Sequence, residues 1–114
     1  MEIKTEDYRI CYDPATATVN FVGSLRLSGP EEYAPIVQLL GEVAHVEQAK
    51  ITLNVQQLEF LNSSGINMLS KFIIEVRKKA RVQMAVQGSQ RIAWQSKSLK
   101  NLQRLMPALP LELI

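Results

Sequence analysis

The sequence has few of the residues that usually form covalent, metal or catalytic sites. Cys11 is the only cysteine, so an internal disulfide is excluded and a reducing cytoplasm is the expected location. His45 is the only histidine, and one histidine with one cysteine cannot form a zinc-ligand cluster. The phosphate-binding patterns G-x-x-x-x-G-K-[ST] and G-x-G-x-x-G do not occur. We therefore expect no metal, no cofactor and no enzymatic activity.

Strong charge and long hydrophobic runs are missing as well. The formal net charge of +2 is too small to require nucleic acid or an anionic membrane as a partner. No apolar run approaches the roughly 20 residues that span a bilayer. The charged residues 1–7 do not resemble a signal peptide and are expected to be flexible. Neither a membrane nor a nucleic acid is therefore an expected partner.

The residues that are present predict one α/β domain. With 46% apolar and 21% charged residues in 114, the chain can form one core. Period-2 alternation predicts strands at 8–12, 16–22, 51–55 and 82–86, the second ending at Gly23 before a loop at 24–29. Helices are predicted from Pro30, from about 64 to 80, and from a Ser89 cap to about 106. Residues 111–114 form a tail or a final strand.

The helices predict how the layers are arranged. Their apolar faces are expected at Tyr33, Ile36, Val37, Leu40 and Val43 in the first, Ile66, Leu69, Phe72, Ile73 and Val76 in the second, and Ile92, Leu99, Leu102 and Met106 in the third. Helical connections between strands imply parallel pairing, and right-handed crossovers place consecutive helices on one face of the sheet.

One polar segment separates a predicted strand from a predicted helix. It is Asn62-Ser63-Ser64-Gly65. Asn or Ser at a helix start accepts a hydrogen bond from a free backbone amide, and such a cap contributes about 1 kcal/mol. A cap is one interpretation of this segment. A regulatory site is the other, because two hydroxyls lie there at the positive end of the helix dipole.

The order of elements around this segment resembles the STAS domain of anti-sigma-factor antagonists. The resemblance covers most of the chain, from about residue 8 to 114, and is strongest in LEFLNSSGINMLSKFIIEVRKK. It implies a single STAS-like domain over residues 1–114, with a mixed β-sheet and helices packed mainly on one face. The family usually has Asp-Ser-Ser/Thr-Gly at this junction, and the matching residues here are Asn62, Ser63, Ser64 and Gly65. Ser63 is then the expected phosphoacceptor, and Ser64 is the second candidate.

The resemblance also implies a function and partners. In that family an ATP-dependent serine kinase, the anti-sigma factor itself, phosphorylates the first hydroxyl of the motif, and a serine phosphatase reverses the modification. This chain is thus expected to be a non-catalytic module in bacterial partner-switching signalling and transcription regulation. The expected partner contacts are Ser24, Leu25, Arg26, Asn62, Ser64, Gly65, Ile66 and Asn67.

Two residues depart from the family pattern. Asn62 replaces the usual Asp, and Arg26 replaces the acid of the Gly-x-Leu-Asp turn that Val22-Gly23-Ser24-Leu25 resembles. Asn62 can cap a helix but cannot supply a negative charge. A carboxylate about 4 Å from a phosphate would cost about 4 kcal/mol per unit charge at an effective dielectric constant of 20. Asparagine removes that repulsion.

Two other classes of function remain open. The chain could be a constitutive scaffold with the same fold, a homodimer included, that is never phosphorylated and uses the sheet face or Trp94. Trp94 is either a residue at the edge of the core or an exposed contact. Nucleic-acid binding is the third class, but the basic residues of the second and third helices are better explained as solvated faces, and only Trp94 lies among them to stack on bases.

Overall fold

The computed structural model describes residues 1–45, 50–79, 82–104 and 109–114. The elements are β1 Glu2–Lys4, β2 Tyr8–Asp13, β3 Thr18–Leu25, α1 Gly29–His45, β4 Lys50–Leu61, α2 Ser63–Lys78, β5 Gln83–Gly88, α3 Ala93–Gln103 and β6 Leu111–Leu113. The strands form a sheet in chain order, β1 to β6. Pairing is antiparallel from β1 to β3 and parallel from β3 to β6. The predicted mixed α/β sheet is confirmed.

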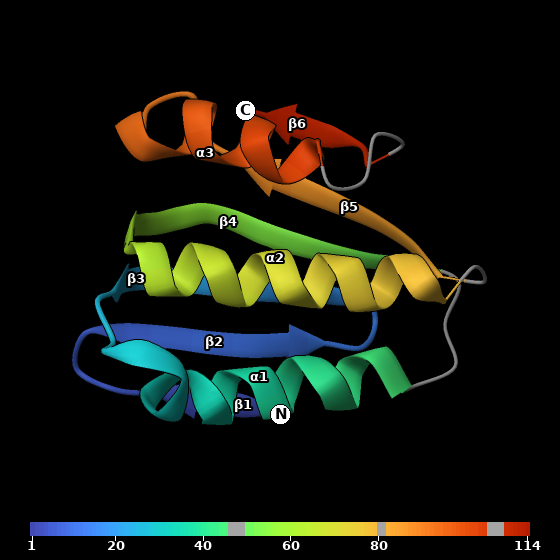
Figure 1. The fold of residues 1–114 in the computed structure, drawn as a ribbon, viewed down its shortest axis with the longest axis horizontal. Coiled ribbons are helices and arrows are strands. Elements are labelled where there is room, and N and C mark those ends of the chain that lie inside the picture. The colour runs from blue at the N-terminus through green and yellow to red at the C-terminus, as the bar shows by residue number, and fades with distance from the viewer. Residues whose placement is uncertain (46–49, 80–81, 105–108) are drawn as a thin grey trace.

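All three helices cover the same face of the sheet (Figure 1). This is the arrangement that right-handed crossovers between neighbouring parallel strands produce. The opposite face carries polar side chains, among which the amide of Asn54 donates to Asn20 Oδ1 at 2.9 Å. The first and last strands, and with them the two ends of the chain, lie at opposite edges of the sheet (Figure 1).

The core lies between the sheet and one stripe of each helix. In α1 the buried residues are Tyr33, Ile36, Leu39, Leu40 and Val43, and in α2 they are Gly65, Met68, Leu69, Phe72, Ile73 and Val76. The prediction was wrong for Val37, which is 50% exposed because Leu39 takes that place on the inner stripe. Ile66, at the edge of the stripe of α2, is only half-buried.

The first residues take part in the sheet as β1, a strand that the sequence did not predict. Glu2 to Lys4 pair antiparallel with Arg9 to Cys11 of β2. Arg9 Nη2 also contacts Glu2 Oε2 at 2.6 Å. The exposed edge of β2 offers unpaired backbone groups, and this short strand satisfies them.

Both strands that lead to the junction are longer than predicted. β3 continues past Gly23 to Leu25, and β4 continues past Val55 to Leu61. Gly23 has a φ of +99°, and a Cβ there would overlap the Asp7 backbone, so glycine permits the irregular register that follows. Leu25 therefore pairs with Leu61, and β3 and β4 end level beside Asn62.

The third helix begins later than predicted. Ser89 does not cap it, because the Ser89 hydroxyl accepts from Arg91 N and the helix begins at Ala93. Ile92 occupies the N-cap position without a side-chain hydrogen bond. The predicted final strand is confirmed as β6. The predicted end of the second helix at 80 and of the third at 106 lie outside the described residues.

Candidate functional site at the start of α2

Asn62 is the N-cap of α2 and connects three parts of the chain. Its Oδ1 accepts from Gly65 N at 2.9 Å and from the Tyr33 hydroxyl of α1 at 2.7 Å. Its Nδ2 donates to Leu27 O, in the segment between β3 and α1, at 2.8 Å. Its backbone N donates to Leu25 O at 3.2 Å. Asn62 thus holds the start of α2, the end of β3 and the first turns of α1 together.

These contacts explain why an amide stands where an acid was expected. Gly65 N–H can only donate and Leu27 O can only accept, so the two ends of the Asn62 side chain have fixed roles. An ionised aspartate at the same position would place a second oxygen against the carbonyl oxygen of Leu27. Asparagine is therefore the residue whose polar atoms all find partners here.

Tyr33 completes this network from inside the core. The side chain is 1% exposed, and its hydroxyl reaches Asn62 Oδ1 from a position 29 residues earlier in the chain. Burial raises the pKa of Tyr33 above its ordinary value of 10.0, and a hydrogen bond from the Leu27 backbone opposes this only in part. The hydroxyl therefore stays protonated and donates to Asn62 at neutral pH.

Gly65 is buried in the first turn of α2 against the same group. A Cβ at this position would overlap Leu61 Cδ1 and would lie 2.7 Å from Tyr33 Oη. Glycine is required here by close packing. Gly65 and Leu25, two of the predicted partner contacts, are both buried, so their contribution to that end of the molecule is to its packing.

The two candidate phosphoacceptors differ in their surroundings. Ser63 is exposed at the first position of α2, and Ser64 is half-buried where it lines a hollow between α1 and α2. Among the described residues neither hydroxyl has a hydrogen-bond partner, while Asn62 does the capping. The cap interpretation of this segment is confirmed at Asn62, and the regulatory-site interpretation stays a prediction that concerns the exposed Ser63 hydroxyl.

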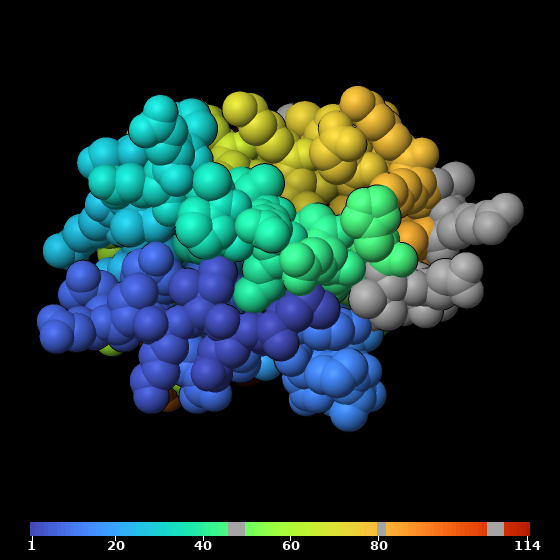
Figure 2. Space-filling view, turned by 90° about the horizontal axis from the view of Figure 1, so that it is seen from below, coloured from blue at the N-terminus to red at the C-terminus, as the bar shows by residue number. Residues whose placement is uncertain are grey.

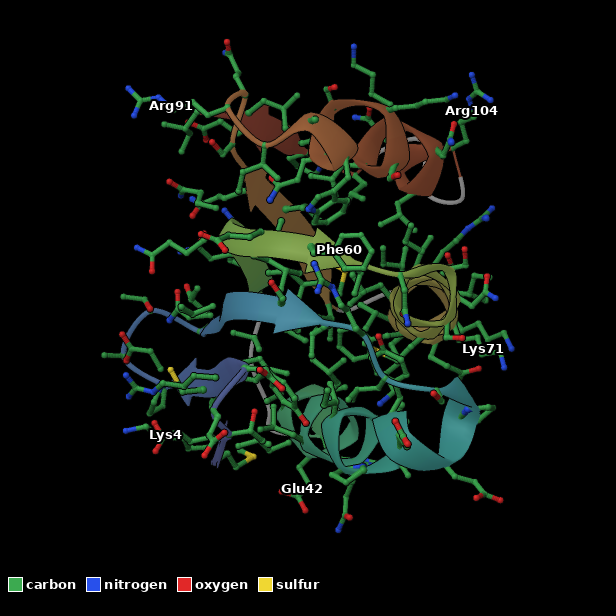
Figure 3. All side chains as sticks on the ribbon, turned by 90° about the vertical axis from the view of Figure 1, so that its left-hand side faces the viewer. Lys4, Glu42, Phe60, Lys71, Arg91 and Arg104 are labelled. Atoms are coloured by element: carbon green, nitrogen blue, oxygen red, sulfur yellow. The ribbon has the colours of Figure 1, made fainter. Side chains whose placement is uncertain are left out.

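The other predicted contact residues form the rim of this end of the molecule. Arg26 is exposed, and its guanidinium carbon lies 4.6 Å from the centroid of the Phe60 ring, which is 37% exposed. Figure 3 views this end with Phe60 near its centre and α2 nearly end-on. Ser24 is half-buried in a polar hollow beside Arg26, and Asn67 is exposed on the second turn of α2. The structure thus brings the predicted segments 24–26 and 62–67 to one end.

Sequence reasoning missed Tyr33 and Leu27 as members of this site. Tyr33 was placed on the apolar face of the first helix only. The signal was its hydroxyl, because a tyrosine on a buried face needs a hydrogen-bond partner. Leu27 contributes only its backbone carbonyl, for which the sequence carries no signal.

A metal site and a membrane-spanning helix were the other features to look for among the described residues. Within residues 1–45, 50–79, 82–104 and 109–114, no three His, Cys, Asp or Glu side chains are grouped so that they could hold a metal ion. Over the same ranges no helix has the length and apolarity needed to cross a membrane. His45 is exposed, and Cys11 is half-buried on the polar face of the sheet.

Comparison with known proteins gives information on the fold. No protein-family model and no curated protein matches the sequence. SiaC of Pseudomonas aeruginosa matches the structure with a TM-score of 0.72 and 16% identity, over 100% of this chain and 96% of SiaC. A chain in the crystal structure of the P. aeruginosa diguanylate cyclase SiaD with its activator SiaC gives 0.72 and 15%, over 99% and 97%.

An anti-sigma factor antagonist from Mycobacterium paratuberculosis also matches. The TM-score is 0.60 with 16% identity, over 98% of this chain and 82% of that one. At these identities the likeness concerns the arrangement of strands and helices. The chain therefore has a STAS-like α/β fold, as the sequence resemblance predicted.

Proposed function

We propose that the chain is a regulatory module that binds a protein partner at the end formed by residues 24–26 and 62–67, and that phosphorylation of Ser63 controls this binding. The observation that carries the proposal is the exposed Ser63 hydroxyl, which has no hydrogen-bond partner among the described residues. Because Asn62 caps α2, the fold does not need the Ser63 hydroxyl. That hydroxyl is free for a kinase to modify.

Electrostatics supports a switch that leaves the fold in place. A phosphate adds about −1.5 to −2 charge and three acceptor oxygens. At Ser63 it would lie at the positive end of α2, whose first amides and dipole favour an anion. The neutral Asn62 amide adds no repulsion. A partner surface fitted to a neutral hydroxyl would instead have to desolvate a dianion, so the partner would dissociate.

The structural neighbours support a protein as the partner. SiaC is the activator of the diguanylate cyclase SiaD and forms a complex with it, and another neighbour is an anti-sigma factor antagonist. For this chain we infer an ATP-dependent serine kinase of the anti-sigma-factor type as partner and a serine phosphatase that resets Ser63, in the cytoplasm of a bacterium. The likeness to SiaC also supports a signalling enzyme, and not only a sigma-factor regulator, as the kind of target that this chain regulates.

Capture of the partner tests the proposal directly. Wild type, Ser63→Ala and Ser63→Asp are used as baits in an extract of the native cells. Wild type and Ser63→Ala are expected to retain one kinase-like protein that Ser63→Asp loses. Ser96→Asp, at another exposed serine near a helix start, controls for added charge and should retain the partner. Equal capture by all four baits would favour the constitutive scaffold.

Intact mass identifies the acceptor. The chain isolated from native cells should carry one phosphate that phosphatase removes and that Ser63→Ala abolishes. A phosphate that persists in Ser63→Ala but is absent from Ser64→Ala would transfer the acceptor role to Ser64. No phosphate under any growth condition would contradict the proposed switch.

A further inference from the structure

A groove lies between α1 and α2 and leads away from the candidate site. The two helices lie side by side and begin at the same end of the molecule (Figures 1 and 2). Two adjacent hollows between them, of about 150 and 260 Å³, share Val37, Met68 and Lys71. The first hollow reaches Ser64, and the second reaches the ends of both helices at His45 and Lys79. We call this combined hollow the α1–α2 groove.

The groove has an apolar floor and an open wall. Phe72 and Val76 form part of its floor, and Val37, 50% exposed, stands on its α1 wall. Gly41 also lines it, and a Cβ at Gly41 would meet no atom of another described segment within 4 Å. Glycine inside a helix is less stable than alanine, and no close contact with a described residue requires it at this position. Its absent side chain keeps the groove open.

The small residues on this wall indicate a helix as occupant. Gly41 and Ala44 are one turn apart on α1, and both line the groove. The distance between packed helices is set by the side chains at their contact, so two small residues allow another helix to approach closely. Along α2 the groove extends from Ser64 to Lys79, on the order of 20 Å or about 15 helical residues.

The charge at the edges of the groove determines which charged residues should flank the apolar stripe of that helix. Lys71 and Lys79 line the groove from α2, and Lys71 projects away from the sheet in Figure 3. Glu75 lies between them, but Lys78 Nζ contacts its Oε1 at 3.4 Å. The edge therefore has a net positive charge, which favours carboxylates on the occupant.

We propose that the α1–α2 groove binds an amphipathic helix of the partner, with an apolar stripe flanked by Glu or Asp. This inference rests on the proposed function, since the helix belongs to the regulated partner. It also explains how the switch acts. Ser64 lines one end of the groove and Ser63 adjoins it, so a phosphate there would repel the acidic flank of the bound helix.

Two synthetic peptides test the groove without knowledge of the partner. Both have about 15 residues with Leu at helical i, i+3, i+4 and i+7 spacing. One carries Glu on its flanks, and its twin carries Lys at the same positions. By fluorescence anisotropy with the unphosphorylated chain, the Glu peptide should bind at least about tenfold more tightly. Equal binding, preference for the Lys twin, or no measurable binding of either would overturn the proposal.

Matched variants locate the binding. Gly41→Phe fills the groove and Val37→Asp places a carboxylate on its wall, so each should weaken binding of the Glu peptide about tenfold. Ile74→Asp is the control, because Ile74 is 36% exposed on α2 and lines neither hollow. It should change affinity by less than about twofold. Circular dichroism confirms folding, and if Gly41→Phe unfolds, Val37→Asp decides.

Two further outcomes separate the explanations. Equal losses of affinity for the Glu peptide in Val37→Asp and Ile74→Asp would overturn the proposed groove site. A dimer of this chain that Val37→Asp dissociates would also overturn it, because a second copy of the chain would then be the occupant. The peptide assay uses neither kinase nor phosphate, so its failure leaves the Ser63 switch standing. If the peptide binds but Ser63 carries no phosphate in native cells, the phosphorylation switch is contradicted and the α1–α2 groove is still supported as a binding site.

Discussion

The junctions that lead from β4 to α2 and from β5 to α3 use polar side chains in opposite ways. Between β4 and α2, the half-buried Asn62 caps the helix and leaves exposed Ser63 beside it. Between β5 and α3, Ile92 at the N-cap makes no side-chain bond, and the polar group is Gln95, which is 0% exposed. The first junction therefore has an exposed polar side chain that the cap does not use, and the polar side chain of the second junction is buried.

Gln95 replaces a strand partner that β4 lacks. The β4–β5 ladder ends at Asn54 and Gln87, but β4 continues for seven more residues to Leu61. Gln95 Nε2 donates to Val55 O at 2.6 Å and to Leu58 O at 3.0 Å, and its Oε1 accepts from Ser89 N at 2.7 Å. Both ends of the side chain are used within the fold.

Trp94 belongs to the same arrangement. It is half-buried, and its indole N–H donates to Leu58 O at 3.1 Å. Of the two interpretations that the sequence left open, the structure favours a residue at the edge of the core. The two junctions differ in whether their polar groups are used within the fold: both ends of the Gln95 side chain are hydrogen-bonded, whereas the Ser63 hydroxyl has no partner among the described residues.

The largest expected effect is at the buried junction. Gln95→Met keeps the side-chain volume but leaves Val55 O and the Ser89 amide without partners, so the free energy of unfolding should fall by about 3 kcal/mol. Urea unfolding followed by circular dichroism measures this. Gln90→Met is the control, since exposed Gln90 bonds Leu113 O and should cost less than about 1 kcal/mol. Equal losses of unfolding free energy in Gln95→Met and Gln90→Met would contradict a special role of the buried Gln95 at this junction.

Asn62 should have the next largest effect. Asn62→Ala removes the cap and the bonds to Tyr33 and Leu27, and we expect a loss of about 2 kcal/mol in unfolding free energy. Asn62→Asp keeps the acceptor but opposes Leu27 O, so its loss should be smaller, about 1 kcal/mol. An Asp variant as stable as wild type would show that the bond to Leu27 contributes nothing.

Tyr33→Phe removes one hydroxyl from the same network and should cost about 1 kcal/mol at neutral pH. It should also change the response to base. Because the folded-state pKa of Tyr33 is raised above 10.0, the unfolded chain loses this proton first, and wild-type stability falls as pH rises above about 10. Unfolding free energies from pH 8 to 11 should show a shallower decline in Tyr33→Phe. Parallel curves for the two proteins would exclude this coupling.

Ser63→Ala should have the smallest effect on stability, less than about 0.5 kcal/mol, because the exposed hydroxyl makes no hydrogen bond with a described residue. Thermal unfolding beside Asn62→Ala provides the measurement and its positive reference. A loss near 1 kcal/mol would assign the capping role to Ser63 and remove the main support for the proposed switch.

The sequence alone determined the order of the elements from β2 to α3, most of the apolar stripes of α1 and α2, and the position of the polar junction at residues 62–65. Alternation, helical spacing and capping residues are local in the chain, so they can be read without the fold. The resemblance to the STAS domain rested on the same local order.

The tertiary structure decided what each polar group does. Tyr33 lies 29 residues from Asn62, and Gln95 lies 40 residues from Val55. Whether such groups meet depends on strand register, on the irregular pairing of β3 with β4 and on where β5 ends. The same register assigned the cap to Asn62 and left Ser63 free, and the packing of α1 beside α2 opened the groove at Gly41. These contacts are long-range, and no local pattern specifies them.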